Sequence, residues 1–396
     1  GQESACAECS HHAALLFVTG HQPQLAHAGV WAKNFAAAGL AKRGHGIGLN
    51  IIVDNDTVGT QAIQVPTGTR DEVRYENVSF DSAQPQQPWE ELKIQDRDLF
   101  ESFGERVREA MQPWGIDPLI TEMWSTATET SRHSDSVVEC LAACRILQER
   151  SWGNTNLELP LSEICQTEAF LTFLTHVILN AKEFQKIYNN IVSFYRQENG
   201  IRNDRHPVPD LLVTDEGFEL PFWFWNENDI ERGQVFCRPM DDLIQLISKG
   251  RVILESKPDQ LKSELRKLQG RGKLRTRALT TTLFSRLFLA DLFIHGIGGA
   301  KYDEMTDLLI KEFYNIEPPE FLVLSATLQL PVQKSEVTEE SVADLKAKLR
   351  DHHYNAERYI SGPEVEELRT RKQLLIEEYW NAQTQGLPKR ERVKLR

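Results

Sequence analysis

The chain has 396 residues, of which 40% are hydrophobic, a composition typical of a soluble globular protein with two or three structural units. Its formal net charge of −13 argues against a general nucleic-acid binder, because such proteins usually carry a broad basic face that replaces phosphate counterions. No stretch approaches the roughly 20 apolar residues of a membrane span, and no signal-peptide pattern opens the sequence, so we expect a cytoplasmic protein without a membrane partner.

Residues 15–56 follow the order strand, loop, helix, strand. An apolar run at 15–18 gives way to Thr19-Gly20-His21-Gln22-Pro23, a helical pattern follows, and a second apolar run ends in Asp54-Asn55-Asp56. The connection is long enough for a helix, so the two strands should be parallel and joined by a right-handed crossover. Ligands bind at the carboxyl ends of such strands. The sequence therefore predicts a site for a small molecule in the crevice that both polar segments face.

The next segments predict a hairpin and several helices. Two short strand candidates and then three helical patterns lie at 62–66, 73–78, 98–111, 134–149 and 167–198. We therefore expect a helical insertion at 90–205 between the two halves of a Rossmann-like parallel core, at 1–89 and 206–335. Cys140 and Cys144 are one helical turn apart and should pack inside this insertion.

Beta character returns beyond residue 206. The aromatic run Phe222-Trp223-Phe224-Trp225 is typical of a strand buried on both faces, and a surface on which a ligand stacks is the alternative. Eight basic residues between Lys257 and Arg277 form either a solvated surface or a clamp for phosphate or carboxylate groups.

A second strand–loop–helix unit follows a helix at 280–289. A strand at 292–294 leads into His295-Gly296-Ile297-Gly298-Gly299, and then come a helix at 301–314 and a strand at 321–324. The backbone N–H groups of such a loop and the dipole of the following helix can bind an anion, although glycine also serves simply to turn the chain. The two units together predict an α/β fold with a Rossmann-like parallel sheet.

The final segment, 336–396, is charged and helical. Val342, Leu345 and Leu349, and then Val365, Leu368 and Leu375, recur at three- and four-residue steps on either side of Gly362-Pro363. An antiparallel helical hairpin is expected, and a homodimer formed through it is the partner that this pattern suggests.

Cysteine usage favours free thiols in a reducing compartment. The six cysteines are too sparse and irregular for a disulfide framework in a chain of this length. Cys6 and Cys9, followed by His11 and His12, have a spacing compatible with metal ligation, but no second pair completes a closed tetrahedral site.

Candidate catalytic residues lie in both units. His21 is suited to contact a phosphate or to act as a general acid, and a loop histidine held by backbone partners is the alternative. Asp54 and Asp56 would point to one side of an extended chain, which suits a magnesium ion or an attacking ammonium group, and a strand-ending turn is equally compatible with them. In the second unit, the candidate is His295, which would contact a phosphate or carboxylate bound at the loop that follows it.

The residues around His295 supply an anion site. The glycines Gly296, Gly298 and Gly299 would receive a phosphate or carboxylate, and Lys301 and Arg277 would supply charge. Tyr302 and Asp303 begin the expected helix, where an acidic residue also complements the helix dipole.

With both units in view, the chain resembles the bacillithiol-biosynthesis cysteine-adding enzymes, which attach cysteine to a glucosaminyl malate. The segment from Val18 to Leu25, with Gly29-Val30-Trp31-Ala32-Lys33-Asn34 after it, is similar to the first motif of that family, and the segments at 274–279 and 295–299 are similar to its second. His21 stands where the family usually has glutamine. The resemblance implies a Rossmann-like core related to nucleotidyltransferases, a coiled-coil tail, and binding roles for Gly20, Gln22 and Asn34.

The activity that the resemblance implies is a ligase forming a carbon–nitrogen bond. Forming an amide in water requires an activated acyl group, so such an enzyme should bind a nucleotide such as ATP or ADP, with or without magnesium, or an already activated donor. A nucleotidyl or nucleotide-sugar transferase using Asp54-Asn55-Asp56 as its metal motif is one alternative. A non-catalytic interaction protein working through the helical hairpin is the other.

Overall fold

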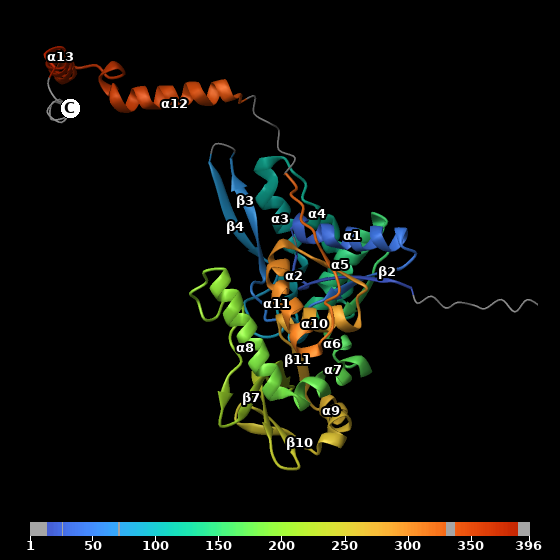
Figure 1. Ribbon diagram of the computed structural model, residues 1–396. Coiled ribbons are helices and arrows are strands. Elements are labelled where there is room, and N and C mark those ends of the chain that lie inside the picture. The colour runs from blue at the N-terminus through green and yellow to red at the C-terminus, as the bar shows by residue number, and fades with distance from the viewer. Residues whose placement is uncertain (1–13, 26, 70–71, 330–336, 387–396) are drawn as a thin grey trace, which may run out of the picture. The chain divides into compact units, whose positions relative to one another are not determined.

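The computed structural model describes residues 14–25, 27–69, 72–329 and 337–386 (Figure 1). The chain divides into two compact units, Gly1–Leu330 and Pro331–Arg396. The cysteine and histidine pairs at 6–12 lie outside the described residues. The domain boundaries expected within the first unit stay predictions.

Five strands form a parallel sheet in the first unit. In order across the sheet they are β13 (Phe321–Val323), β12 (Leu292–His295), β1 (Leu16–His21), β2 (Ile47–Ile52) and β5 (Leu157–Pro160). Every neighbouring pair is parallel. The chain runs from β1 through β2 to one edge and from β12 to the other, so the strand order reverses between β1 and β12. Open α/β sheets bind ligands at such a reversal.

In both units a helix connects two parallel neighbouring strands, as predicted, and the right-handedness of the first connection stays a prediction. Helix α1 (Ala28–Arg43) joins β1 to β2, and α11 (Ile297–Tyr314) joins β12 to β13. One boundary was wrong: α11 begins at Ile297 rather than 301, so Gly298 and Gly299 lie in its first turn. A glycine costs a helix only about 1 kcal/mol relative to alanine, and the apolar face of α11, which buries Met305 and Leu309, outweighs that cost.

The region at 90–205 is mostly helical, as expected. Its helices are α2 (Arg97–Glu101), α3 (Phe103–Met111), α4 (Leu119–Ser131), α5 (Val137–Ser151), α6 (Leu161–Ile164), α7 (Glu168–Leu179) and α8 (Ala181–Glu198). Helices α4 and α6 and strand β5 were not predicted from the sequence. A single helix was expected where α7 and α8 lie, and these two are separate because Asn180 leaves helical geometry. Ser136, not Ser134, caps α5 by accepting a hydrogen bond from the backbone N–H of Glu139.

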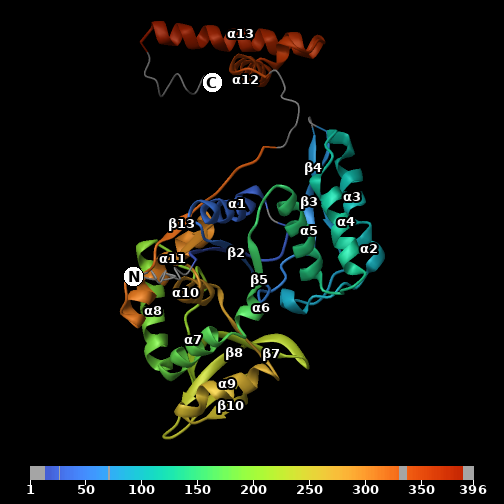
Figure 2. The ribbon, with the colours of Figure 1, turned by 90° about the vertical axis from the view of Figure 1, so that its right-hand side faces the viewer.

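The predicted hairpin and a separate small core are also present. β3 (Ala62–Gly68) pairs with β4 (Val73–Ser79), and helices α2 to α5 lie beside this hairpin (Figure 2). The ring of Trp124 lies 4.8 Å from Phe100 and 4.4 Å from Phe103, centroid to centroid. Cys140 and Cys144 are buried in the same core, which confirms their packing role.

The second half of the first unit adds an antiparallel sheet. Its order is β10 (Arg251–Ser256), β9 (Ile244–Ser248), β8 (Asp229–Pro239), β7 (Gly217–Asn226) and β11 (Lys273–Thr276), with β6 (Val213–Thr214) beside β7. Phe222, Phe224 and Trp225 are buried, whereas Trp223 is only half-buried. The preferred interpretation of the aromatic run therefore holds for three residues and not for Trp223.

The second unit contains α12 (Glu339–Tyr354), a short 3₁₀ helix η4 (Ala356–Arg358) and α13 (Pro363–Thr384). Most of the apolar residues expected to face one another stay exposed, with exposed fractions of 63% for Leu345 and 57% for Leu368, whereas Val365 is half-buried. Two helices are therefore present, and their antiparallel pairing stays a prediction. Among the described residues, no helix has the length and apolar character needed to cross a membrane.

Candidate functional site

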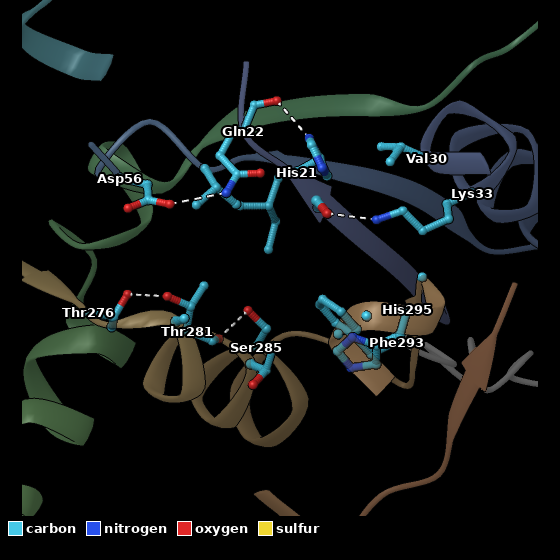
Figure 3. A pocket seen from close by; sticks show the side chains of 18 of the residues that line it. His21, Gln22, Val30, Lys33, Asp56, Thr276, Thr281, Ser285, Phe293 and His295 are labelled. Atoms are coloured by element: carbon cyan, nitrogen blue, oxygen red, sulfur yellow. Dashed lines mark hydrogen bonds between the residues drawn. The ribbon is translucent and has the colours of Figure 1, made fainter. Parts of the chain in front are cut away.

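A cavity of about 620 Å³ lies at the carboxyl ends of β1, β2 and β12. Figure 3 shows side chains from β1 and α1 along one wall and side chains from β11, α10 (Ala278–Phe288) and β12 along the facing wall. The charged and ring-bearing residues among those that line it are His21, His27, Lys33, Asp56, Trp223, Arg232, Arg277, Phe293 and His295. The crevice predicted from the first unit thus includes the second unit as well.

Three helices begin at this cavity. Their N-cap residues, His27 for α1, Arg277 for α10 and Gly296 for α11, all line it. None of the three helices carries an acidic residue in its first turn, and the N-caps of α10 and α11 provide no side-chain cap. Unpaired backbone N–H groups and the positive ends of three helix dipoles therefore face one space, which favours an anion.

Lys33 adds a buried cation. Its side chain is 5% exposed, and its Nζ donates a hydrogen bond to the carbonyl of Gly20 at 2.9 Å. Within the described ranges, no carboxylate forms an ion pair with it, and burial lowers its pKa to about 8. At neutral pH the cavity thus contains an ammonium group that has no counter-ion among the residues that the structure describes.

Lys33 was not among the binding residues expected from the sequence, whereas its neighbour Asn34 was. Gly29, Lys33 and Ala37 are spaced by four residues and share the buried face of α1, which is the signal that could have identified Lys33. Asn34 lies one residue further around the helix, where its Nδ2 donates to Glu149 Oε1 at 2.8 Å. Asn34 does not line this cavity and serves the packing of α1 against α5.

His21 lines the cavity as an uncharged ring. Its Nδ1 lies 3.1 Å from the carbonyl oxygen of Gln22. Burial and the nearby charge of Lys33 lower the pKa of His21 to about 4. At neutral pH His21 can therefore donate or accept a hydrogen bond, but it brings no positive charge to a phosphate.

Asp54 and Asp56 point in different directions, so the expectation that they share one side was wrong. β2 ends at Ile52 and the chain then turns, so the alternation of an extended strand is lost. Asp54 is buried and accepts hydrogen bonds from Ser162 N and Oγ at 2.9 and 2.5 Å, and burial raises its pKa to about 6. Only Asp56 lines the cavity, where it accepts from Gln22 Nε2 at 3.1 Å.

These carboxylates do not fit a magnesium ion. Each already accepts hydrogen bonds from protein groups, and Asp56 also pairs with Arg232 at 3.3 Å. In the part of the chain that the structure describes, no group of three or more histidine, cysteine or acidic side chains is placed to hold a metal.

His295 is held by a buried ion pair. Its Nε2 lies 2.9 Å from Asp303 Oδ2, and the same oxygen accepts from Arg286 Nη1 at 2.6 Å. Burial alone would raise the pKa of Asp303, but the hydrogen bond from His295 and the Arg286 charge outweigh it and hold that pKa below its ordinary value. Because the carboxylate accepts at Nε2, Nδ1 is the free acceptor of the ring.

The first turn of α11 comes very close to that free nitrogen. A Cβ added to Gly299 would lie 2.9 Å from His295 Nδ1, so only glycine leaves this approach open. The glycine here has a definite role: it keeps Nδ1 and the helix N-terminus in the same corner of the cavity.

Two arginines flank Trp223 at the far end of the cavity. The Arg277 guanidinium lies 4.1 Å from the ring centroid of Trp223 and that of Arg232 lies 4.8 Å from it. Arg277 donates to Glu219 Oε1 at 2.6 Å. Arg277 was expected at the anion site from the sequence, and Arg232 was not. A ligand-stacking role for Trp223 was only the alternative interpretation of the aromatic run.

The other basic residues of 257–277 do not reach the cavity. Arg266 and Lys262 pair with Glu168, and Arg275 pairs with Glu90 at 2.8 Å. Within this segment, Arg277 is the one basic residue that lines the cavity, and the clamp interpretation stays a prediction for it.

The remaining predicted residues divide between the cavity and its surroundings. Those that line it are Gly20, Gln22, Gly296, Gly298 and Gly299. Lys301 is exposed, and Tyr302 packs beside the His206 ring at 5.8 Å, so neither lines the cavity. Asp303 does not line the cavity either, but it contacts the lining residue His295.

The α10 wall presents hydroxyl oxygens. Thr282 Oγ1 donates to the Leu279 carbonyl at 3.0 Å, and Ser285 Oγ donates to the Thr281 carbonyl at 2.8 Å. Because these protons are used within the helix, the oxygens are left to accept hydrogen bonds from a ligand.

Comparison with known proteins gives no family. No protein-family model matches the chain, and no curated protein is significantly similar to it.

Proposed function

We propose that this chain is a ligase of the cysteine-adding type, which joins an amino acid to an acceptor containing an amino sugar. One observation carries the proposal: three helix N-termini and the cation Lys33, which has no carboxylate partner among the described residues, face one cavity, whereas Arg232 and Arg277 in its wall pair with Asp56 and Glu219. In a chain of net charge −13, such a local excess of positive charge selects an anionic ligand.

The proposed reaction is attack of an amine on an activated acyl group. The amine nitrogen forms a bond to the acyl carbon, the bond from that carbon to the leaving oxygen breaks, and the amine proton passes to Nδ1 of His295. Asp303 holds the ring in the tautomer that accepts this proton and stabilises the imidazolium that results.

The α10 wall supports an acceptor that carries hydroxyl or ammonium groups. Thr282 and Ser285 offer oxygens that accept hydrogen bonds, and sugar hydroxyls are donors of matching chemistry. An acceptor with a negative group at one end and a sugar at the other fits the two walls of the cavity.

A nucleotide fits the same positive corner. The phosphates of ATP or ADP would be held by backbone N–H groups at Gly298 and Gly299 and by Lys33, and a bound nucleotide supplies the activation that amide formation needs. Since Asp54 and Asp56 do not converge, no magnesium is assigned to them.

A nucleotidyl or nucleotide-sugar transferase is the second candidate function. The proposed likeness of the core to nucleotidyltransferases belongs to this candidate as well. The phosphate-compatible helix N-termini favour it, whereas its expected metal motif is absent in the described turn at 54–56. Release of pyrophosphate or of a nucleoside diphosphate without amide formation would favour this candidate.

The homodimer is part of the proposal too. The exposed apolar side chains of α12 and α13, among them Leu345 and Leu349, would pair between two copies of the chain. Light scattering of the full chain should give twice the monomer mass, and Leu345→Lys with Leu349→Lys should give the monomer. If both forms are monomeric, the helices serve another purpose.

Mass spectrometry tests the ligase directly. The chain is incubated with cysteine, glucosaminyl malate and ATP, with and without magnesium, and we expect the mass of the amide adduct, with Asp303→Asn as the inactive control. An adduct that forms equally with Asp303→Asn would contradict the assigned base, and no adduct under any of these conditions would contradict the ligase.

A further inference from the structure

A second cavity lies behind the loop that follows β1. It has a volume of about 170 Å³ and lies between that loop, α1, β3, α4 and α5. The residues that line it are Pro23, Gln24, Leu25, Trp31, Ile63, Leu119, Ile120, Met123, Leu141 and Arg145. Eight of these ten side chains are apolar. The proposed ligase does not use them, although Pro23, Gln24 and Leu25 belong to the first predicted motif.

The two polar lining residues do not give this cavity a free charge. Arg145 pairs with Glu149 at 3.0 Å and with Glu158 at 2.7 Å, so its charge is balanced within the protein. Gln24 is exposed and lies at the rim. An ion in the cavity would gain little, whereas an apolar group would gain contact with eight apolar side chains.

One wall of this cavity is a fixed aromatic ring. The Trp31 indole N–H donates to Glu149 Oε1 at 2.6 Å, and the ring lies 5.2 Å from that of Trp152, centroid to centroid. Because its polar atom is already bonded, Trp31 presents only apolar surface to a ligand, and its orientation does not depend on one.

The second cavity lies near the main one but is a separate space. A narrow space of about 20 Å³ lies between them; His21, Gln22 and Val30 line both it and the main cavity, and Pro23, Trp31 and Arg145 line both it and the apolar cavity. The space is too small for a substrate to pass, so the two cavities share a loop rather than one ligand.

We infer that this cavity is a binding site for a small uncharged apolar molecule of about six carbon atoms. Apolar cavities of roughly 150 Å³ bind molecules the size of benzene, and a water molecule there would need two or more polar partners. The site goes beyond the proposed ligase, because it needs neither an anion nor the residues that would perform the reaction.

Fluorine NMR with fluorobenzene as the probe tests this site on the full chain. We expect saturable broadening of the probe signal at roughly millimolar concentration, as suits a ligand with so few atoms. Leu119→Asp places a carboxylate on the rim at a residue that is 36% exposed, so the fold should tolerate it, and it should weaken binding at least about tenfold. Ile120→Trp, which fills the cavity, should do the same.

The matched control is Leu147→Asp. Leu147 lies on α5, is 58% exposed and lies outside the cavity, so this variant should bind the probe as the unchanged chain does. The inference is wrong if the unchanged chain shows no saturable binding, or if Leu119→Asp and Leu147→Asp bind the probe equally well. Neither result depends on whether the ligase reaction is found.

Discussion

The two strand–helix units of the core begin alike and end in different chemistry. In β1–α1 and in β12–α11 a parallel strand leads into a helix whose N-terminus faces the same cavity. The first unit adds a neutral His21 and a buried cation, Lys33, for which the described part of the chain provides no carboxylate partner. The second adds a histidine held by the buried pair of Asp303 and Arg286. The same strand-to-helix connection thus positions a positive charge in the first unit and a proton acceptor in the second.

The two units also shift the pKa of a buried carboxylate in opposite directions. Asp54, beyond β2, accepts hydrogen bonds from Ser162 and lies near the charges of Glu90 and Arg275, but burial outweighs them and raises its pKa to about 6. Asp303 has His295 and Arg286 as partners, and its pKa lies below the ordinary value. Burial alone therefore does not decide the charge of a carboxylate, because the partners decide it.

The largest expected effect breaks the second unit. Asp303→Asn removes the acceptor that fixes the tautomer of His295, and we expect the rate of amide formation to fall by about 10³-fold or more. Turnover measured by mass spectrometry checks this, with Glu304→Gln, the exposed neighbour on α11, as the control. A loss below tenfold, or an equal loss in the control, would mean that His295 is not the base.

A pH titration of stability tests the contrasting carboxylate, Asp54. Its pKa is higher in the folded chain than in the unfolded chain, so the folded chain binds the proton more tightly between about pH 4 and pH 6. The contribution of Asp54 to the free energy of unfolding should therefore decrease as pH rises through that range, by about 3 kcal/mol.

Asp54→Asn removes that titration. Urea unfolding of both chains at pH 4 and at pH 6.5 should show that the wild type loses the extra stability and the variant does not. Parallel curves for the two chains would show that Asp54 does not titrate in this range.

Lys33→Met tests the charge that belongs to the first unit. A charge-assisted hydrogen bond to a phosphate is worth about 2 kcal/mol, so the affinity for ATP should fall roughly thirtyfold. Calorimetric titration measures it, and Lys42→Met, on an exposed position of the same helix, should bind as the wild type does. Equal affinities in all three chains would place the nucleotide elsewhere.

Sulfate binding against pH sharpens the same point without changing a residue. Since sulfate does not titrate near neutral pH, its affinity should stay level from about pH 6 to pH 7.5 and fall as pH rises through the Lys33 pKa of about 8. His21, with its pKa of about 4, should add no step near pH 6. A step near pH 6 that is absent from His21→Ala would show that the imidazole is charged there.

The smallest effect concerns the platform between the two arginines. Trp223→Leu removes the ring on which Arg277 and Arg232 lie, worth roughly 1 kcal/mol, so ATP affinity should fall about fivefold. Trp152→Leu, which alters a ring outside the main cavity, is the control in the same titration. Unchanged binding in Trp223→Leu would mean that other contacts hold the arginines.

The parts of the fold that depend on a local sequence pattern could be predicted. The apolar runs of β1, β2 and β12, the β3–β4 hairpin and the helical spacing of α5 all have periodicities that a single chain displays. β5 was missed because its four residues, Leu157 to Pro160, alternate too briefly to stand out, and they form a strand by pairing with β2.

The position of the site was predicted from the sequence more accurately than the residues that form it. Both loops were placed at the strand ends, but Asp54 was included on the assumption of an extended chain that in fact turns. Arg232 and Trp223 come from the antiparallel sheet, and only the tertiary fold brings them to β1. Lys33 was within reach, because its four-residue spacing from Gly29 already placed it on the buried face of α1.

A crystal structure of the chain grown with selenate tests the central claim, that this cavity binds an anion. Anomalous scattering identifies selenium without ambiguity, and selenate shares the charge and shape of a phosphate group. We predict selenate in contact with Lys33 Nζ or with the first backbone N–H groups of α11, beside Gly298 and Gly299. Selenate bound at other positions of the protein, with none in this cavity, would contradict the account.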